Sequence, residues 1–390
     1  MMIKKSSFDA IVIGAGPAGS TAAYLLAQSG FHVLVLDKRQ FPRDKLCGGL
    51  LTYKTVKLLE NIFHTSSDYL ASNQIISHQS SRYGVNLRDK ACIRGKLKYP
   101  FHFVDRQIYD SFWLNKARQA GAEFRSGVKV ISLDPIKNQV ITGNGHRYSA
   151  TYILGADGAP SRLCRLLTAG GFIKKEKKSG MAIAMELIVS QSLTPALPDY
   201  PVIYLGHIRW GYAWCFPRKD LRVLGICGLS EKSGKFLKRG MIQFLKTNRI
   251  SADNICAAKS HALPYGNYLT QPGYGNILLL GDACGLADPL LGEGIYYAHK
   301  SGQLSALAAI QAYPSSQNAF RIYRQHLYAN IIPELKFARF GRQILFSLPG
   351  TWPGVILSTL LKINPRICEE TIQGQRSFRW FRRIITDSRK

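Results

Sequence analysis

Apolar runs of strand length alternate with helical repeats near the amino terminus. Phe8–Ile13 and His32–Leu36 are such runs, and Ala18–Gln28 between them repeats its apolar positions with helical spacing. A strand, a helix and a second strand in this order form a βαβ unit with parallel strands. The pattern therefore predicts a parallel sheet that begins near residue 8.

Two later apolar runs end in glycine turns. Thr151–Leu154 is followed by Gly155-Ala156-Asp157-Gly158, and Ile277–Leu280 is followed by Gly281-Asp282 and a helical pattern at Gly294–Ala309. The carboxyl ends of parallel strands meet at one edge of a sheet, so we expect these turns to lie together there.

The middle of the chain has a different pattern. Four β-like runs predict an antiparallel sheet inserted between the parts that form the parallel sheet, and a helix at Lys235–Lys246 interrupts it. These runs are Met181–Val189, Val202–His207, Tyr212–Phe216 and Arg222–Leu229. We therefore expect an α/β protein with a discontinuous Rossmann-like domain (1–75, 100–175 and 265–312), an inserted substrate domain (76–99 and 176–264) and a helical basic region (313–390).

The last region combines apolar and basic character. Gln343–Leu361 contains no charged residue, but Pro349, Gly350, Pro353 and Gly354 in its middle would break a spanning helix. Residues 336–390 hold 11 Lys+Arg and 3 Asp+Glu. Two interpretations stay open, a helical lid on the core and a shallow dip into a membrane interface.

The whole chain is strongly basic. Its 390 residues include 52 Lys+Arg and 24 Asp+Glu, a formal net charge of +28. Such an excess predicts an anionic partner, such as a phosphate-bearing substrate, an acidic protein or an anionic membrane surface. No nucleic-acid-binding module and no Cys/His metal-ligand spacing is present in the sequence, so we expect neither nucleic acid nor a metal as a ligand.

The eight cysteines are scattered and form no CxxC pair. The first apolar run is too short for a secretory signal, which predicts reduced thiols and a cytoplasmic protein, with peripheral attachment to the inner face of the membrane as an option.

The first glycine motif has the residue types that a dinucleotide requires. Gly14 permits the tight turn, Gly16 lets the backbone approach a pyrophosphate, and Gly19 lets helix and strand pack closely. Asp37, at the end of the second strand, is placed to accept from a ribose hydroxyl. The predicted cofactor contacts in this part are Gly14, Gly16, Pro17, Ala18, Gly19, Asp37 and Lys38.

The third glycine motif, Gly281–Ile295, also follows a strand and precedes a helix. Two such elements so far apart along the chain indicate an elongated cofactor held at both ends, and this narrows the predicted cofactor from a general dinucleotide to FAD. Asp282 would accept from ribityl hydroxyls, and the helix that starts near Ile295 would direct its positive end at the flavin. The predicted cofactor contacts in this part are Gly281, Asp282, Pro289, Gly292, Gly294 and Ile295. Asp157, in the second glycine turn (Gly155-Ala156-Asp157-Gly158), is a further predicted contact.

Taken together, GAGPAG, GADGAPS and GDACGLADPLLGEGI resemble the p-hydroxybenzoate hydroxylase-like flavoproteins. DKRQFPRDKLCGGLL at Asp37–Leu51 and GYAWCFP at Gly211–Pro217 resemble, more closely, the geranylgeranyl reductase family of FAD-dependent oxidoreductases. The resemblance covers about residues 8–310. It implies reduction of carbon–carbon double bonds in isoprenoid chains of lipids, quinones or pigment precursors.

The resemblance also implies roles for individual residues. Arg106 would contact FAD, and Cys47 and Gly48 would lie beside the flavin ring, with Cys47 as a candidate for proton handling. An isolated alkene needs a hydride and a proton, and aromatic faces stabilise the developing positive charge. The implied catalytic residues are Cys47, Tyr212 and Trp214, and the implied substrate contacts are Gly49, Tyr212, Trp214, Phe216 and Pro217.

Other interpretations stay open at this stage. Cys47 is also consistent with a small residue that packs between two loops. Tyr212 and Trp214 are also consistent with ordinary core residues of a sheet. The same scaffold serves aromatic hydroxylases and halogenases, and a membrane-associated flavin-binding protein without catalysis is a further alternative. The sequence contains no second glycine motif for a nicotinamide cofactor, so the electron donor stays open, with NAD(P)H and ferredoxin as the two possibilities.

Overall fold

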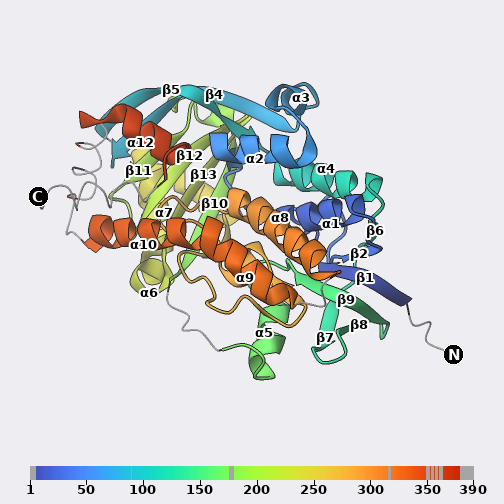
Figure 1. Ribbon diagram of the computed structural model, residues 1–390. Helices are drawn as coiled ribbons and strands as arrows, with labels where there is room; N and C mark the ends of the chain where they lie inside the picture. The colour runs from blue at the N-terminus through green and yellow to red at the C-terminus, as the bar shows by residue number, and fades with distance from the viewer. Residues whose placement is uncertain are drawn as a thin grey trace, which may run out of the picture.

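The computed structural model describes residues 6–88, 90–174, 180–314, 318–347, 352, 355, 359 and 363–377. Two large sheets form its framework, and helices cover them (Figure 1). The mixed α/β architecture predicted from the sequence is confirmed, with a first sheet that is largely parallel and a second sheet that is largely antiparallel.

The first sheet has the strand order β15-β16-β9-β1-β2-β6, and a β7–β8 hairpin continues from β9. Strands β16, β9, β1, β2 and β6 are parallel to one another, so their carboxyl ends share one edge. The strand bounds are β1 Ser6–Ile13, β2 Val33–Leu36, β6 Glu123–Arg125, β7 Val130–Asp134, β8 Gln139–Thr142, β9 Arg147–Gly155, β15 Gly273–Tyr274 and β16 Ile277–Leu279.

Helices α1 (Pro17–Gln28), α4 (Arg106–Gln119) and α8 (Ile295–Ala312) pack together on this sheet. Residues 10–13 of β1 are apolar and buried, which follows from their position between two neighbouring strands under these helices. Helix α5 (Arg162–Ala169) packs against β7 instead.

The second sheet has the order β14-β10-β13-β12-β11-β4-β5-β3. Its neighbours are antiparallel except β11 and β4, which are parallel, and this exception was not predicted. The bounds are β3 Leu50–Leu51, β4 Ile76–Leu87, β5 Lys90–Val104, β10 Met181–Ser190, β11 Val202–Leu205, β12 Gly211–Arg218, β13 Leu221–Leu229 and β14 Lys259–Pro264.

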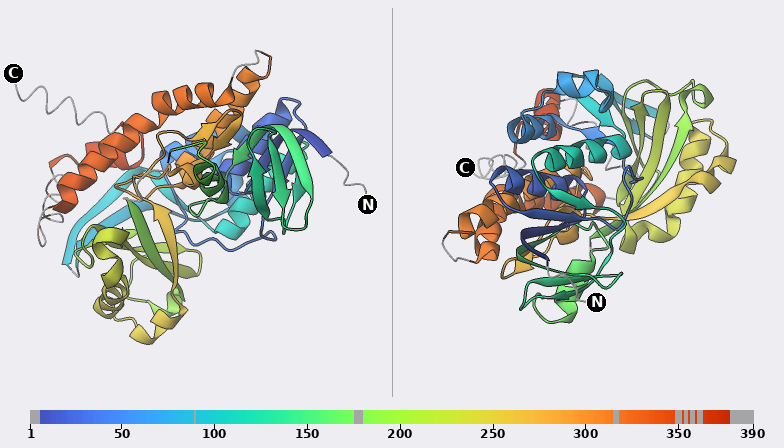
Figure 2. Two further views of the ribbon diagram at one scale, coloured as in Figure 1. Left: turned by 90° about the horizontal axis from the view of Figure 1, so that it is seen from below. Right: turned by 90° about the vertical axis from the view of Figure 1, so that its right-hand side faces the viewer.

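The second sheet has two different faces because side chains alternate along each strand. Its outer face, which includes Ala213 and Cys215, packs on helix α7 (Leu237–Thr247) through Met241 and Phe244. Figure 2 shows α6 (Ser230–Ser233) and α7 on the side of this sheet that lies away from β1 and β2. The inner face is left to line the functional site.

The remaining helices close the structure around this inner face. Helices α2 (Tyr53–Phe63) and α3 (Ser67–Ser72) follow β3, and α9 (Ala319–Asn330) and α10 (Ile332–Ser347) extend α8 along the same side (Figure 1). Gln373, just after α12 (Pro365–Ile372), accepts from the Tyr53 backbone at 2.7 Å and donates to the Tyr99 carbonyl at 2.8 Å. The carboxyl-terminal part is thus attached to both α2 and β5.

Some details depart from the sequence-based expectations. The alternating run Glu123–Leu133 has the sequence pattern of one strand, but it forms two strands, because Gly127 adopts a φ of +70° and the chain turns between β6 and β7. Phe101–Val104 lies in the range expected for the Rossmann-like domain (100–175), but it is the end of β5, in the second sheet. Strand β14 was not predicted. Pro349, Gly350, Pro353 and Gly354 lie outside the described residues, and within the described ones we find no helix that is long and apolar enough to cross a membrane.

Candidate active site

A cavity of about 2060 Å³ extends from the carboxyl edge of the first sheet to the inner face of the second. A single small-molecule ligand occupies a pocket of about 300–1,000 Å³, so this volume has room for two ligands. The cavity is lined by seventeen of the predicted site residues: Gly14, Gly16, Pro17, Ala18, Asp37, Lys38, Cys47, Gly48, Arg106, Asp157, Tyr212, Trp214, Phe216, Asp282, Gly292, Gly294 and Ile295.

Five predicted site residues do not line the cavity: Gly19, Gly49, Pro217, Gly281 and Pro289. Two of these glycines permit close packing, since a Cβ on Gly19 would lie 1.9 Å from the Gly14 carbonyl oxygen and one on Gly49 would lie 2.2 Å from that of Val104. Pro217 follows Phe216 on β12, and successive strand residues point to opposite faces. Their predicted contacts with cofactor or substrate stay predictions.

The first glycine turn forms one end of the cavity. Gly14 adopts a φ of +104°, and a Cβ there would lie 2.2 Å from the Ala156 carbonyl oxygen, so the first and second glycine turns are in contact. Helix α1 begins without a side-chain cap, which leaves its amino-terminal amides available to an anion. The carboxylate of Asp37 accepts from the backbone N–H of Ala15 and of Arg39, each at 2.8 Å, and is held in place at the cavity wall.

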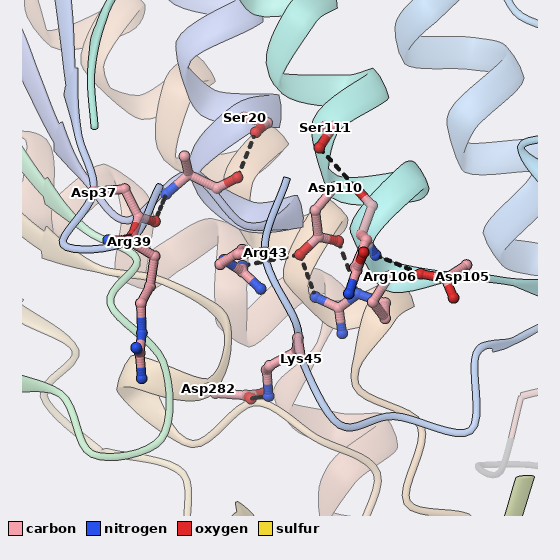
Figure 3. A network of polar contacts seen from close by, with 12 residues as sticks. Ser20, Asp37, Arg39, Arg43, Lys45, Asp105, Arg106, Asp110, Ser111 and Asp282 are labelled. Carbon is pink, nitrogen blue, oxygen red and sulfur yellow. Dashed lines mark hydrogen bonds and ion pairs between the residues drawn. The ribbon is translucent and has the colours of Figure 1, made fainter. Parts of the chain in front are cut away.

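Two arginines share one buried carboxylate beside α1 (Figure 3). Arg106 makes a two-pronged ion pair with Asp110, with both hydrogen bonds at 2.8 Å, and Arg43 binds the same carboxylate at 2.9 Å. A Cβ on Gly16 would meet only the Arg43 guanidinium, at 3.3 Å. Two cations against one anion leave excess positive charge next to the helix start, which suits a pyrophosphate.

The third glycine motif forms the other side of the cavity. Lys45 lies 3.9 Å from the Asp282 carboxylate, and α8 begins after Gly294 without a side-chain cap. The turn before it is fixed by Asp288, which accepts from the N–H groups of Leu290 and Leu291 at 2.7 Å each. A rigid turn therefore presents the open amino terminus of α8 to the cavity.

Buried polar contacts also fix the turn before α8 on the side away from the cavity. Lys54 forms an ion pair with Glu293 at 2.6 Å, and the Thr52 hydroxyl donates to the same carboxylate at 2.6 Å. From the cavity side, the Tyr212 hydroxyl donates to the Leu291 carbonyl at 2.6 Å. Gly292 is required here, because a Cβ would lie 2.7 Å from the Tyr212 oxygen.

The loop that contains Cys47 packs on the aromatic strand β12. A Cβ on Gly48 would lie 2.7 Å from the Phe216 ring, and the Cys47 sulfur accepts from the Gly49 N–H at 3.4 Å. Tyr212, Trp214 and Phe216 form a row whose ring centroids are 5.9 and 6.1 Å apart. The structure therefore brings the implied catalytic residues to one wall of the cavity.

Beyond this row the cavity is lined mostly by apolar side chains. They come from β4, β5 and β11 of the second sheet and from α10 and α12, and include Val85, Leu97, Phe101, Ile203, Leu205, Phe337, Phe340 and Ile344. Phe340 and Ile344 are each 51% exposed, which places them where the cavity meets solvent. This outer part suits a long apolar ligand.

Several site residues were not found from the sequence. Arg43, Lys45 and Asp110 were missed because their roles depend on partners on other elements, although Arg43 and Lys45 lie within the DKRQFPRDKLCGG segment. Glu186 and His261, which line the cavity from β10 and β14, were missed as well. Glu186 had one signal, an acidic residue within an apolar strand run.

The nucleotide-binding end of the cavity fits a dinucleotide, as shown by the uncapped start of α1, the Arg43–Arg106 pair and the oriented carboxylate of Asp37. The family pattern described as FAD binding domain matches residues 7–300 of the chain. The chain belongs to this family. It is an FAD-binding oxidoreductase, as predicted.

Three relatives are named as reductases. The chain is 29% identical over 313 residues to menaquinone reductase of Mycolicibacterium smegmatis, which covers 76% of this chain and 75% of that protein. It is 28% identical over 322 residues to geranylgeranyl diphosphate reductase of Rhodobacter capsulatus, covering 80% and 77%. It is 27% identical over 325 residues to digeranylgeranylglycerophospholipid reductase of Methanosarcina acetivorans, also covering 80% and 77%. The predicted resemblance to geranylgeranyl reductases is confirmed.

Solved structures show the same fold. A geranylgeranyl bacteriochlorophyll reductase-like protein from Thermoplasma acidophilum superposes with a TM-score of 0.77 at 20% identity, covering 92% of this chain and 91% of that one. A point mutant of the halogenase PltM in complex with FAD gives a TM-score of 0.69 at 20% identity, covering 87% of this chain and 77% of that one. One fold thus serves different chemistries, and the substrate must be argued from the site.

Proposed function

We propose that the protein is an FAD-dependent reductase that saturates carbon–carbon double bonds of an isoprenoid chain on a lipid, quinone or pigment precursor. The observation that carries this proposal is the continuity of the cavity. The nucleotide-binding loops, the aromatic row and the apolar outer part line one chamber. A long apolar chain that enters past α10 would therefore reach the Cys47 loop without crossing a polar barrier.

In this proposal different residues bind the cofactor, position the alkene and bind the rest of the substrate. Arg43 and Arg106 with the start of α1 bind the pyrophosphate, and Asp37 orients the ribose. Bound FAD in its reduced form supplies a hydride. Trp214 and Phe216 hold the alkene against the cofactor and exclude water, and their ring faces favour the positive charge that develops on carbon. The apolar outer wall binds the rest of the chain.

Three probes test this function: geranylgeranyl diphosphate, a digeranylgeranylglycerol phospholipid and a menaquinone. Each is incubated anaerobically with the full chain, whose FAD has been reduced with dithionite, and the products are measured by mass spectrometry. We expect a mass gain of one H₂ per saturated double bond with at least one probe. Product that forms only when oxygen or halide is added would identify a monooxygenase or a halogenase and overturn the proposal.

The basic charge suggests the partners of this reaction. Exposed Lys38, Arg39, Lys129 and Arg165 line the same end of the cavity as the nucleotide loops. We propose that the cationic surface attracts an anionic electron donor, either NAD(P)H or an acidic protein such as ferredoxin, and that the region around α10 contacts an anionic membrane surface. Reduction of the bound flavin by each donor, followed by absorbance, separates the two classes.

A further inference from the structure

A buried acid lies across one strand from the aromatic row. Glu186 on β10 is 4% exposed and lines the cavity. In the sheet register Glu186 pairs with Gly225 on β13, and Gly225 pairs with Trp214 on β12. Because Gly225 has no side chain, the Trp214 indole lies over the strand between them. The carboxyl group therefore lies on the same cavity wall as the aromatic row.

Glu186 also faces the loop on the flavin side, where the backbone of Cys47 lies close enough to lower the pKa of the carboxyl group. The acid thus lies between the second sheet and the loop that the resemblance places beside the flavin. A substrate alkene held between Trp214 and the cofactor would be within reach of this carboxyl group.

Three cations lie near Glu186, and each of them is closer to the carboxylate of another acidic residue. Arg218 pairs with Asp105 at 2.9 Å, Lys45 lies 3.9 Å from Asp282, and Arg106 pairs with Asp110 at 2.8 Å. Among the described residues no ion pair to Glu186 is found. Its charge is therefore only partly compensated.

The other titratable groups around Glu186 lie on the strands beside it. Cys227 on β13 and His261 on β14 both pair with Ala184, which precedes Glu186 by two residues on the same face. Lys259 on β14 pairs with Glu186 itself, but its ammonium lies 3.3 Å from Asp44 at the surface. Burial lowers the pKa of His261 to about 4, so this imidazole is neutral near pH 7.

Burial raises the pKa of Glu186 to about 7, against the opposing effect of Arg218, Lys45, Arg106 and the Cys47 backbone. A carboxyl group with this pKa carries a proton for much of the time in neutral solution. A general acid works best when its pKa is close to the working pH. Both the protonation state and the position of Glu186 are therefore suited to a general acid.

We propose that Glu186 is the proton donor for saturation of the substrate double bond. This assignment rests on the proposed function. One alkene carbon receives the hydride that reduced FAD supplies, and the other receives the Glu186 proton, so that two C–H bonds replace the π bond and the cofactor is oxidised by two electrons. Glu186 is left as a carboxylate and regains a proton from solvent through the open cavity.

The other candidate donors are less suitable. The Tyr212 hydroxyl already donates to the Leu291 carbonyl, and burial raises its pKa well above the usual value. His261 is neutral, so its imidazole has no acidic proton to give at pH 7. Cys47, which the resemblance suggests for proton handling, uses its sulfur to accept from the Gly49 N–H and contacts the Arg106 guanidinium. Its position then serves to orient the loop.

The test compares single-turnover reduction by the wild type, E186Q and E186D across a pH series, with E123Q on the exposed strand β6 as the control. The rate constant of the wild type is expected to fall as pH rises through about 7, because Glu186 loses its proton there. E186Q keeps its FAD but loses roughly a hundredfold or more in rate, while E186D retains part of the rate and the pH dependence. E123Q is expected to match the wild type.

A second readout does not depend on turnover. Infrared difference spectra of the oxidised holoenzyme across the same pH series should contain the carbonyl stretch of a protonated carboxyl group that disappears near pH 7 in the wild type and is missing in E186Q. Wild-type rates in E186Q, or an unchanged pH profile, overturn the assignment while the proposed function stands. A wild-type protein that reduces none of the isoprenoid probes overturns the proposed function and the assignment with it.

Discussion

The indole of Trp214 fills the space that Gly225 leaves open on the neighbouring strand. A Cβ on Gly225 would lie 2.1 Å from Cζ2 of the indole and 2.2 Å from Cε2. The ring therefore lies across β13, with its Nε1 buried and without a hydrogen-bond partner in the described part of the chain. A residue without a side chain thus determines the shape of the cavity wall.

Gly225→Ala is predicted to displace this indole. Extra atoms in a packed site cost about 1–3 kcal/mol, so we expect a moderate loss of stability together with a large rise in KM for the isoprenoid substrate. FAD content should be unchanged, because the nucleotide loops lie on the other sheet. Gly234→Ala is the control, since a Cβ there would have its nearest neighbour at 3.7 Å. Equal KM values for the two variants would contradict the prediction.

Arg43→Ala is predicted to weaken FAD binding. The change removes one of the two cations on Asp110 and one charged donor beside the start of α1. Hydrogen bonds to charged groups are worth about 1.5–3 kcal/mol, so the dissociation constant should rise roughly ten- to hundredfold. Quenching of flavin fluorescence measures it. Lys57→Ala, which removes an exposed ion pair with Glu60, is the control and should leave FAD affinity unchanged.

Gly292→Ala is predicted to loosen the turn before α8, for two reasons. Its φ of +71° disfavours an alanine, and the new Cβ would lie 2.7 Å from the Tyr212 oxygen. We expect faster FAD release. In Tyr212→Phe only the bond to Leu291 is lost, at a cost of about 1 kcal/mol.

The double variant separates these two causes. Removal of the Tyr212 hydroxyl relieves the collision but not the backbone strain, so Gly292→Ala with Tyr212→Phe should release FAD more slowly than the sum of the single effects predicts. Strict additivity of the two changes in the release rate would show that the hydroxyl and position 292 do not interact.

Phe340→Asp with Ile344→Asp is predicted to reduce binding to anionic vesicles. Both side chains lie on α10 at the opening of the cavity and are half exposed, and the surrounding region is basic. Interfacial binding combines buried apolar area with electrostatic attraction. Co-sedimentation with phosphatidylserine vesicles should fall in the variant and, for the wild type, with added salt. Ile136→Asp, a change of a 72% exposed side chain in the β7–β8 turn, is the control. Undiminished binding by the α10 variant would refute membrane contact at this face.

The sequence was sufficient for the features that depend on neighbouring residues. Each glycine turn follows its own strand and precedes its own helix, so the turns around Gly14 and Gly281 could be placed without knowledge of the rest. The resemblance carried by GYAWCFP implied that Tyr212, Trp214 and Phe216 line the substrate cavity together. These local patterns determined most of the cofactor cradle.

The features that depend on distant partners could not be predicted in this way. Asp110 is an ordinary helix residue until Arg43 and Arg106 meet at its carboxylate. Glu186 gains its environment from β12, β13, β14 and the Cys47 loop together. Strand β4 pairs in parallel with β11, which lies more than 100 residues later in the chain. Turn residues in the sequence predict only the pairing of strands that follow one another directly, so this contact could not be predicted from them.

The single chamber has a consequence for the order in which ligands leave. FAD and a long apolar substrate would share one continuous space whose outer part opens beside Phe340 and Ile344. A substrate tail in that part would close this opening and cover the flavin end of the cofactor. Occupancy by the lipid should then prolong cofactor retention, and exhaustively delipidated protein should lose its yellow colour on dialysis sooner than protein that still carries a bound lipid.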